Sequence, residues 1–246
     1  MDNTTRFDGK GEIYAKARPK YAAGLLEYLK NTRSIPAGSV FADIGSGTGI
    51  FTEQLLNCGY TVYAVEPNTD MRRKAEEKLS GYAGFHSVNG TADHTSLPSG
   101  RVDYVTAAQA FHWFDAAAFQ KECQRILKPG GKVLIIYNTR DEEAECTKAL
   151  ADLRREYNPE FHGFSNGIRD GACRAFFNRQ CDVLKWDNRL IYDRDGYINR
   201  LLSSSYSLKE GDPRFGEYME AINRLFDRFA VDGRVAVPMN TVVYIG

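Results

Sequence analysis

The sequence has no excess of charge of either sign, few histidines and no long apolar run. Its 246 residues include 32 Lys plus Arg and 32 Asp plus Glu, so the formal net charge is zero. Proteins that bind nucleic acid through its phosphates usually carry a basic excess or a basic stripe, and this sequence has neither. Nucleic acid is therefore disfavoured as the main partner.

The longest purely aliphatic stretch is the short run Val133–Ile136, far below the roughly 18 apolar residues of a membrane-spanning helix. The first six residues also lack the apolar run of a secretory signal. We expect a soluble, cytoplasmic protein without a membrane span.

The sequence contains five cysteines and four histidines. The odd number of cysteines and the absence of a Cys-x-x-Cys pair argue against a disulfide framework and against a zinc site. The histidines show no His-x-x-x-His spacing. We therefore expect reduced, mostly buried thiols and no metal.

Short apolar runs alternate with helical patterns in the first part of the chain. The runs are rich in β-branched and aromatic residues, as in strands that are covered on both faces. Strands are predicted over 40–44, 61–65, 85–89, 102–107 and 132–137. Helices are predicted over 21–30, 68–79 and 115–127. A further helix is predicted in the segment that carries Phe51 and stops at Gly59. This order predicts an α/β fold with right-handed crossovers and a parallel, doubly wound sheet.

The pattern changes after Asn138. The sequence predicts helices over 141–157, 195–203 and 213–229, a loop over 158–171, and strands over 183–192 and 241–245. No linker is evident, so we expect a single domain over 1–246. Its parts are a cofactor-binding core (1–138), an inserted helical cap for the substrate (139–235) and a closing strand (236–246).

The strongest local motif is Asp43-Ile44-Gly45-Ser46-Gly47-Thr48-Gly49, directly after the first predicted strand. Three glycines in five residues let a ligand approach the backbone closely, whereas a tight turn without a ligand needs only one. The third glycine of the dinucleotide fingerprint is replaced by Ile50, and Asp43 would repel a pyrophosphate. A carboxylate at this position favours a ligand with a cationic group.

Glu66 follows the second predicted strand, about 20 residues after Gly45, as an acid that binds ribose hydroxyls does. The alternative is a solvated acid at the end of a strand. The glycine loop that precedes it favours the ribose role.

These residues resemble a known family. Asp43–Gly49, Glu66, Gly90–His94 and Arg125–Gly131 together look like class I S-adenosylmethionine-dependent methyltransferases. The likeness is greatest to the small-molecule branch that includes ubiquinone/menaquinone-biosynthesis and trans-aconitate-type enzymes, and it covers roughly residues 10–138. The resemblance implies a Rossmann-like sheet of seven strands, mostly parallel, with the last strand antiparallel.

The resemblance also implies roles for individual residues. The glycine loop would hold the methionine and ribose parts of S-adenosylmethionine, and Glu66 would hold the ribose hydroxyls. The residues assigned to the loop are Asp43, Gly45, Ser46, Gly47 and Gly49, and those expected near the adenine are Asn68, Met71, Ala92 and Asp93. For Met71 a place in the helix core is an equal alternative, and Asp93 is alternatively a turn residue.

Gln109-Ala110-Phe111-His112-Trp113 resembles the Gln-Ala-x-His-Trp segment of the same branch, at the tip of the fourth predicted strand. Gln109 would contact the cofactor, and the aromatic Trp113 would form part of the substrate site. His112 is a candidate to orient or deprotonate the acceptor, or alternatively a structural hydrogen-bonding residue. The segment lacks the Asn/Asp-Pro-Pro-Tyr/Phe motif of enzymes that methylate nucleic acid bases.

The stretch Tyr14–Tyr21 resembles the Tyr-x-x-x-Arg-Pro-x-Tyr segment that covers the cofactor in this branch. Tyr14 and Arg18 would bind the methionine end of the cofactor, where Arg18 would pair with a carboxylate. Tyr21 would contact the substrate. A surface ion pair is the alternative for Arg18.

Together these features predict direct in-line transfer of a methyl group to a small-molecule acceptor. The alternatives are a methyltransferase-like binding module without turnover, a nucleotide-dependent oxidoreductase, and a methyltransferase that acts on protein. The sequence does not identify the acceptor or the oligomeric state. The residues of the cap that are candidates to select the acceptor are Arg140, Tyr157, Phe161, His162, Phe164, Arg169 and Tyr206.

Overall fold

The computed structural model describes residues 19–31, 35–164, 170–204 and 206–246. The chain divides into two compact units. The first unit comprises residues 1–138, 167–186 and 241–246, and the second comprises 139–166 and 187–240. That residues 1–246 form a single domain remains a prediction.

The first unit contains a seven-stranded sheet in the order β3-β2-β1-β4-β5-β9-β6. The strands are β1 (Val40–Ile44), β2 (Thr61–Val65), β3 (Phe85–Val88), β4 (Val102–Ala108), β5 (Leu127–Arg140), β6 (Asp182–Asp187) and β9 (Met239–Ile245). The pairs β1–β2, β1–β4, β2–β3 and β4–β5 are parallel. Val133 and Gly246 each donate a backbone N–H to the other's carbonyl, which is the pattern of an antiparallel pair. The predicted doubly wound sheet with an antiparallel last strand is confirmed.

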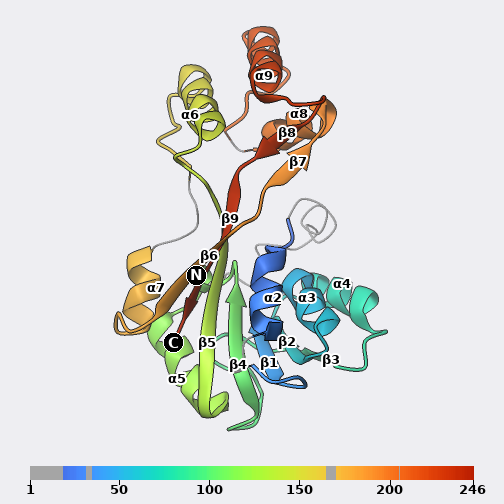
Figure 1. Ribbon diagram of the computed structural model, residues 1–246, viewed down its shortest axis with the longest axis vertical. Helices are drawn as coiled ribbons and strands as arrows, with labels where there is room; N and C mark the ends of the chain where they lie inside the picture. Colours follow the sequence, from blue (N-terminus) through green and yellow to red (C-terminus); the bar gives the residue numbers. More distant parts are fainter. Residues whose placement is uncertain (1–18, 32–34, 165–169, 205) are drawn as a thin grey trace. The chain divides into compact units, whose positions relative to one another are not determined.

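Helices cover both faces of this sheet (Figure 1). One face packs against α2 (Ala23–Asn31), α3 (Ile50–Asn57) and α4 (Thr69–Leu79), and the other against α5 (Ala116–Ile126) and α7 (Asp170–Phe176). Neighbouring strand residues alternate between the two cores: Phe41 joins the first and Ala42 the second. Burial on both faces explains why the strands are apolar without a polar alternation.

Local hydrogen bonds set the starts of two of these helices. The Asn68 side chain accepts the N–H of Met71 at 3.0 Å, and the Asp115 side chain accepts the N–H of Ala118 at 2.9 Å. Both residues therefore act as N-caps.

Several boundaries differ from the sequence prediction. The segment predicted as one strand over 183–192 forms β6 and a separate strand β7 (Leu190–Tyr192), with the half-buried Asn188 and the exposed Arg189 between them. Helix α7 begins at Asp170, inside the predicted loop, and its Cys173 and Phe176 join the core of the first unit. Strand β5 begins at Leu127, before the predicted boundary.

The second unit has its own core. It contains α6 (Glu145–Tyr157), α8 (Arg194–Leu202), α9 (Phe215–Phe229) and a two-stranded antiparallel sheet of β7 and β8 (Val235–Val237). Tyr157 and Tyr218 pack at 5.2 Å between ring centroids in this core, and Ile222 is fully buried. No described helix of either unit is long and apolar enough to cross a membrane.

Candidate functional site

A pocket lies in the first unit at the carboxyl ends of the central strands, where open parallel sheets bind ligands. The empty space at this pocket, including the open solvent at its mouth, is about 540 Å³. Its lining combines the glycine loop with the tips of β4 and β5 and the residues before α2, namely Pro19, Tyr21, Asp43, Gly45, Ser46, Gly47, Thr48, Ile50, Phe51, Ala108, Gln109 and Asn138.

The three glycines of the loop have different environments. A Cβ on Gly45 would lie 2.7 Å from the Cβ of Ala110, and one on Gly49 would lie 2.6 Å from Cδ1 of Leu79. Gly47 has a φ of +57°, and a Cβ there would meet nothing within 4 Å. Two glycines thus allow close packing within the protein, whereas Gly47 leaves open space at the pocket.

Asp43 is a buried carboxylate at this pocket, with 1% of its surface exposed. Its two oxygens accept hydrogen bonds from the hydroxyls of Thr52 at 2.7 Å and Thr106 at 2.8 Å. Burial raises the pKa of Asp43 to about 6, although both hydroxyls oppose this change. A positive charge bound nearby would favour the ionised form of the carboxyl.

Glu66 is also buried and reaches back to the glycine loop from the end of β2. Its carboxylate accepts the N–H of Gly47 at 2.8 Å and the N–H of Asn68 at 2.9 Å. Burial raises the pKa of Glu66, and the two N–H groups and Arg72 oppose the rise. The alternative of a solvated acid at a strand end is therefore wrong for this residue.

Two hydroxyls of the glycine loop are buried without a hydrogen-bond partner among the described residues, Oγ of Ser46 and Oγ1 of Thr48. Buried polar atoms are normally paired, so unpaired ones at a pocket indicate groups that a ligand can satisfy. The polar loop, its open glycine and its buried acid together form a site for a polar ligand.

Gln109 closes the pocket at the tip of β4 with a left-handed backbone, φ 55°. Such a conformation is unfavourable for residues other than glycine and is often found at functional sites. The Gln109 side chain donates to the carbonyl of Asn138 at 3.0 Å. This hydrogen bond links the ends of β4 and β5.

Asn138 extends this network to the segment before α2. Its side chain donates to the carbonyl of Lys20 at 3.2 Å and accepts from the hydroxyl of Thr241 at 2.6 Å. Gln54 holds the same segment, because it accepts the N–H of Tyr21 at 2.9 Å and donates to its carbonyl at 3.0 Å. Tyr21 is buried and packs edge-on against Phe51 at 5.0 Å.

Sequence reasoning missed Asn138, Gln54, Thr52 and Thr106. The signal for Asn138 and Thr106 was a polar residue at or near the carboxyl end of a buried strand, the edge where ligands bind. Thr52 and Gln54 lie on a helix and are buried, but the pattern of one helix does not reveal which carboxylate or backbone group lies opposite.

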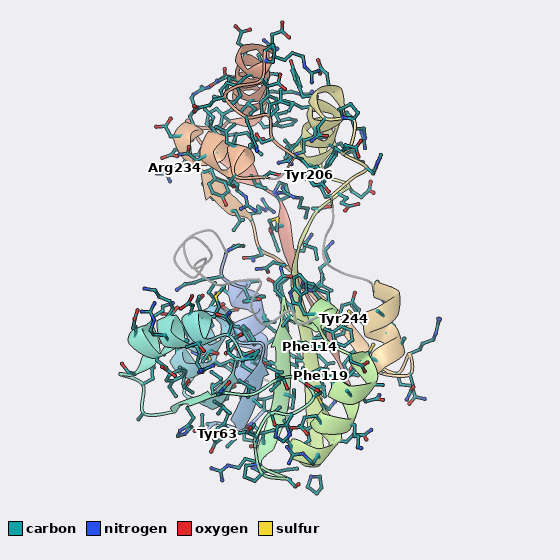
Figure 2. The ribbon with its side chains drawn as sticks, turned by 180° about the vertical axis from the view of Figure 1, so that it is seen from behind. Tyr63, Phe114, Phe119, Tyr206, Arg234 and Tyr244 are labelled. Atoms are coloured by element: carbon teal, nitrogen blue, oxygen red, sulfur yellow. The ribbon has the colours of Figure 1, made fainter. Side chains whose placement is uncertain are left out.

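His112 and Trp113 lie outside the lining of the pocket, in a short 3-10 helix (Phe111–Trp113), and both are exposed. Nδ1 of His112 lies 3.4 Å from the hydroxyl of Tyr137, whose pKa is raised mainly by burial. Nearby Phe114 and Phe119, labelled in Figure 2, pack at 4.9 Å between ring centroids. The structure therefore gives His112 a hydrogen-bonding neighbour and leaves its catalytic role a prediction.

The residues expected near the adenine lie on two segments. Met71 is buried in α4 one turn after its cap Asn68, Ala92 is half-buried and Asp93 is exposed. The loop that carries Ala92 and Asp93 continues to Thr95. Glu122 holds Thr95 by accepting its backbone N–H at 2.8 Å and its hydroxyl at 2.5 Å. Tyr14 and Arg18 lie outside the described residues.

Several solved structures with this architecture are described as methyltransferases. A protein described as a type II methyltransferase from Anaeromyxobacter dehalogenans superposes with a TM-score of 0.64 at 21% identity, over 93% of this chain and 95% of that chain. A methyltransferase structure from an antibiotic biosynthesis pathway of Anabaena variabilis superposes with a TM-score of 0.58 at 20% identity, over 89% and 96%. The first unit therefore has the class I methyltransferase fold.

Sequence comparisons agree with the fold. The model of the methyltransferase domain family matches residues 42–135. An uncharacterized methyltransferase of Mycobacterium tuberculosis is 32% identical over 211 residues, which are 84% of this chain and 79% of the relative. One from Geobacillus kaustophilus is 39% identical over 145 residues, 52% of this chain and 66% of the relative. The chain belongs to the class I methyltransferase family.

Proposed function

We propose that the pocket binds S-adenosylmethionine and that the protein transfers its methyl group to a small-molecule acceptor. The observation that carries this proposal is the buried carboxylate of Asp43 at the glycine loop. An ionised carboxylate in a site of low polarity attracts a cationic ligand and repels a diphosphate. S-adenosylmethionine carries a sulfonium and an amino group, whereas dinucleotides carry a pyrophosphate.

The remaining residues of the loop suit the same ligand. The unpaired hydroxyls of Ser46 and Thr48 offer hydrogen bonds to its polar groups, and the space at Gly47 admits it close to the backbone. A Haemonchus contortus N-methyltransferase with a related fold, 16% identical and with a TM-score of 0.56, was solved in complex with S-adenosylhomocysteine. This neighbour supports the choice of ligand but does not identify the acceptor.

The resemblance to the small-molecule branch supplies the orientation that we propose. Glu66 would accept hydrogen bonds from the ribose hydroxyls with the lone pairs that Gly47 and Asn68 leave available. The adenine would lie between the start of α4 and the loop at Ala92 and Asp93. Gln109 would contact the edge of the cofactor, and Tyr21 would contact the acceptor.

When bound, S-adenosylmethionine would supply an electrophilic methyl group, which would pass directly to the acceptor with S-adenosylhomocysteine as the leaving group. The protein's own residues then have to orient the two reactants and exclude water, which contributes on the order of 7–11 kcal/mol at best. A general base is needed only for a weakly acidic acceptor such as a hydroxyl, and His112 is our candidate for that role. A carboxylate or thiolate acceptor needs no base.

Calorimetry with the full chain tests the ligand. We expect S-adenosylmethionine and S-adenosylhomocysteine to bind with dissociation constants of tens of micromolar or less, and NAD to show no binding. Gly47→Arg should abolish binding because its side chain enters the open space at the loop, whereas Arg73→Gln on the exposed face of α4 should not affect it. Absence of binding to the unmodified protein at these concentrations contradicts the proposal.

Turnover separates an enzyme from a binding module. Release of S-adenosylhomocysteine would be measured with a panel of carboxylic acids, phenols, amines and thiols, and with a set of proteins. We expect turnover with at least one small molecule. Turnover with proteins alone would support methyltransferase activity but contradict the proposal of a small-molecule acceptor. Tight binding without any turnover would favour the binding module.

A further inference from the structure

Three arginines lie close together in the second unit: Arg140 and Arg154 lie by the ring of Phe164, and Arg140 and Arg200 line one pocket. Arg140 ends β5, Arg154 lies on α6 and Arg200 lies on α8. Arg154 is 3% exposed, and the other two are half-buried. Burial and the positive charges of Arg200 and Arg154 lower the pKa of Arg140 to about 10, so the three guanidinium groups are close enough to repel one another.

No carboxylate compensates this cluster within the described residues. None of the ion pairs found there includes Arg140, Arg154 or Arg200, although nine other arginines of the chain do form such pairs. Buried charges are normally paired, because an unpaired charge loses its hydration without a substitute. Among the residues that the structure describes, no carboxylate therefore forms an ion pair with this cluster.

Aromatic rings lie next to these groups. The guanidinium carbon of Arg140 lies 4.7 Å from the ring centroid of Phe164, and that of Arg154 lies 5.8 Å from the same ring. Arg200 lies 5.7 Å from the ring centroid of Tyr192. Stacking on a ring leaves the N–H groups at the edge of the guanidinium plane available as donors.

Most of these edge donors are unused in the described part of the chain. Each guanidinium has five N–H groups, and a single hydrogen bond is found for the three, from Arg154 to the hydroxyl of Ser204 at 2.6 Å. Nε of Arg154 and Nε of Arg200 are buried without a partner among the described residues. Such unpaired buried donors indicate an acceptor that a ligand supplies.

A pocket opens at the cluster. Arg140 and Arg200, but not the buried Arg154, line it together with Cys146, Thr147, Tyr197 and apolar side chains of α6, α8 and β8. Apolar walls strengthen the attraction between arginine and an anion, because they keep the local polarity low. All of these residues belong to the second unit.

We propose that the second unit contains an anion-binding site, in which Arg140 and Arg200 bind the carboxylate or phosphate group of a small molecule and the buried Arg154 adds positive charge beside them. The fork of donors on arginine matches both groups. The inference rests on the second unit alone and does not depend on the ligand proposed for the first.

Thermal unfolding of the full chain tests the site, with citrate and inorganic phosphate as probes and sodium chloride as the reference at equal ionic strength. A ligand that binds only the folded state raises Tm with its concentration. We expect at least one probe to raise Tm in a saturable way, and Arg200→Gln to weaken its apparent affinity at least tenfold. The probe that acts distinguishes a carboxylate site from a phosphate site.

Arg224→Gln is the matched control, since Arg224 is 68% exposed on α9 and its loss removes the same charge. This variant should keep the response of the unmodified protein. No response beyond sodium chloride in the unmodified protein, or an unchanged response in Arg200→Gln, overturns the proposal.

Arg140→Gln separates a binding role from simple stacking. If the cluster binds an anion, removing one of its repelling charges should leave Tm unchanged or higher without the probe and should abolish the response to it. A Tm that is lower by the same amount with and without the probe rejects the site and assigns Arg140 to packing. Binding of S-adenosylhomocysteine to the same variants should be unchanged, so failure of this site and failure of the proposed function are distinguishable.

Discussion

Glu66 holds the glycine loop by accepting the backbone N–H of Gly47 at 2.8 Å. The second oxygen of the carboxylate accepts the N–H of Asn68, the residue that caps α4. One buried side chain therefore fixes both the loop that follows β1 and the turn that follows β2. The acid predicted from sequence to contact a ligand also shapes the site in the ligand's absence.

Glu66→Gln should destabilise the protein and weaken binding of S-adenosylmethionine. The amide presents an NH₂ group in place of one carboxylate oxygen, so either Gly47 or Asn68 loses its acceptor. We expect a loss of about 1–3 kcal/mol in the free energy of unfolding and at least tenfold weaker binding. Urea unfolding and calorimetry measure the two effects, and unchanged affinity in a folded variant would remove Glu66 from the ligand site.

Asp43→Asn should stabilise the free protein while weakening binding of the proposed cofactor. The folded-state pKa of Asp43, about 6, lies above the ordinary value of 3.8, so its ionisation at neutral pH opposes folding. An asparagine removes this cost of about 1–3 kcal/mol and still bonds to Thr52 and Thr106, whose hydroxyls donate or accept. We expect a higher Tm at pH 7 and at least tenfold weaker binding. A lower Tm would show that the carboxylate stabilises the fold.

The affinity for S-adenosylmethionine should rise with pH between 5 and 7. Below its pKa of about 6 Asp43 is protonated, and a cationic ligand must then displace the proton. We expect affinity to increase up to tenfold per pH unit below 6 and to level off above it. Calorimetry of Asp43→Asn should show a weaker pH dependence, because that carboxyl group is then absent. A flat profile in the unmodified protein contradicts the role of Asp43.

Substitution by alanine should mainly reduce ligand affinity at Gly47 and mainly reduce stability at Gly49. At Gly47 the new methyl group meets open space at the pocket, so the main cost to folding is the left-handed backbone, about 1–2 kcal/mol. At Gly49 the methyl group would also collide with the buried Leu79 at 2.6 Å. We expect Gly47→Ala to lose affinity for S-adenosylhomocysteine with a small change in Tm, and Gly49→Ala to lose more stability. The reverse order would contradict our assignment of Gly47 to the ligand.

Glu122 should contribute to stability in a pH-dependent way. Hydrogen bonds from Arg125 and Thr95 lower its pKa to about 2, from an ordinary value of 4.5. Because the folded-state pKa is lowered, the contribution is complete above pH 4.5 and is lost as the pH falls toward 2. Glu122→Gln should therefore reduce the free energy of unfolding at pH 7 by about 1–3 kcal/mol and much less at pH 2. Urea unfolding at several pH values measures this, and an equal effect at all pH values would exclude the carboxylate as the cause.

The sequence by itself determined the elements around the glycine loop. Apolar runs of four to seven residues predict buried strands, and the caps Asn68 and Asp115 mark two helix starts, because both signals depend on neighbouring residues. The motif at Asp43–Gly49 and the acid at Glu66 also indicate the position of the site. A parallel sheet brings the carboxyl ends of its strands to one edge, so their approximate proximity follows from the order of the strands.

Only the tertiary structure decided which groups face each other. The hydroxyls of Thr52 and Thr106 meet Asp43 from a helix and a neighbouring strand, and this contact is not encoded in any local spacing. The grouping of Arg140, Arg154 and Arg200 likewise comes from one strand and two helices. The energy of a buried charge depends on all the groups that surround it, and packing brings those groups together from distant parts of the chain.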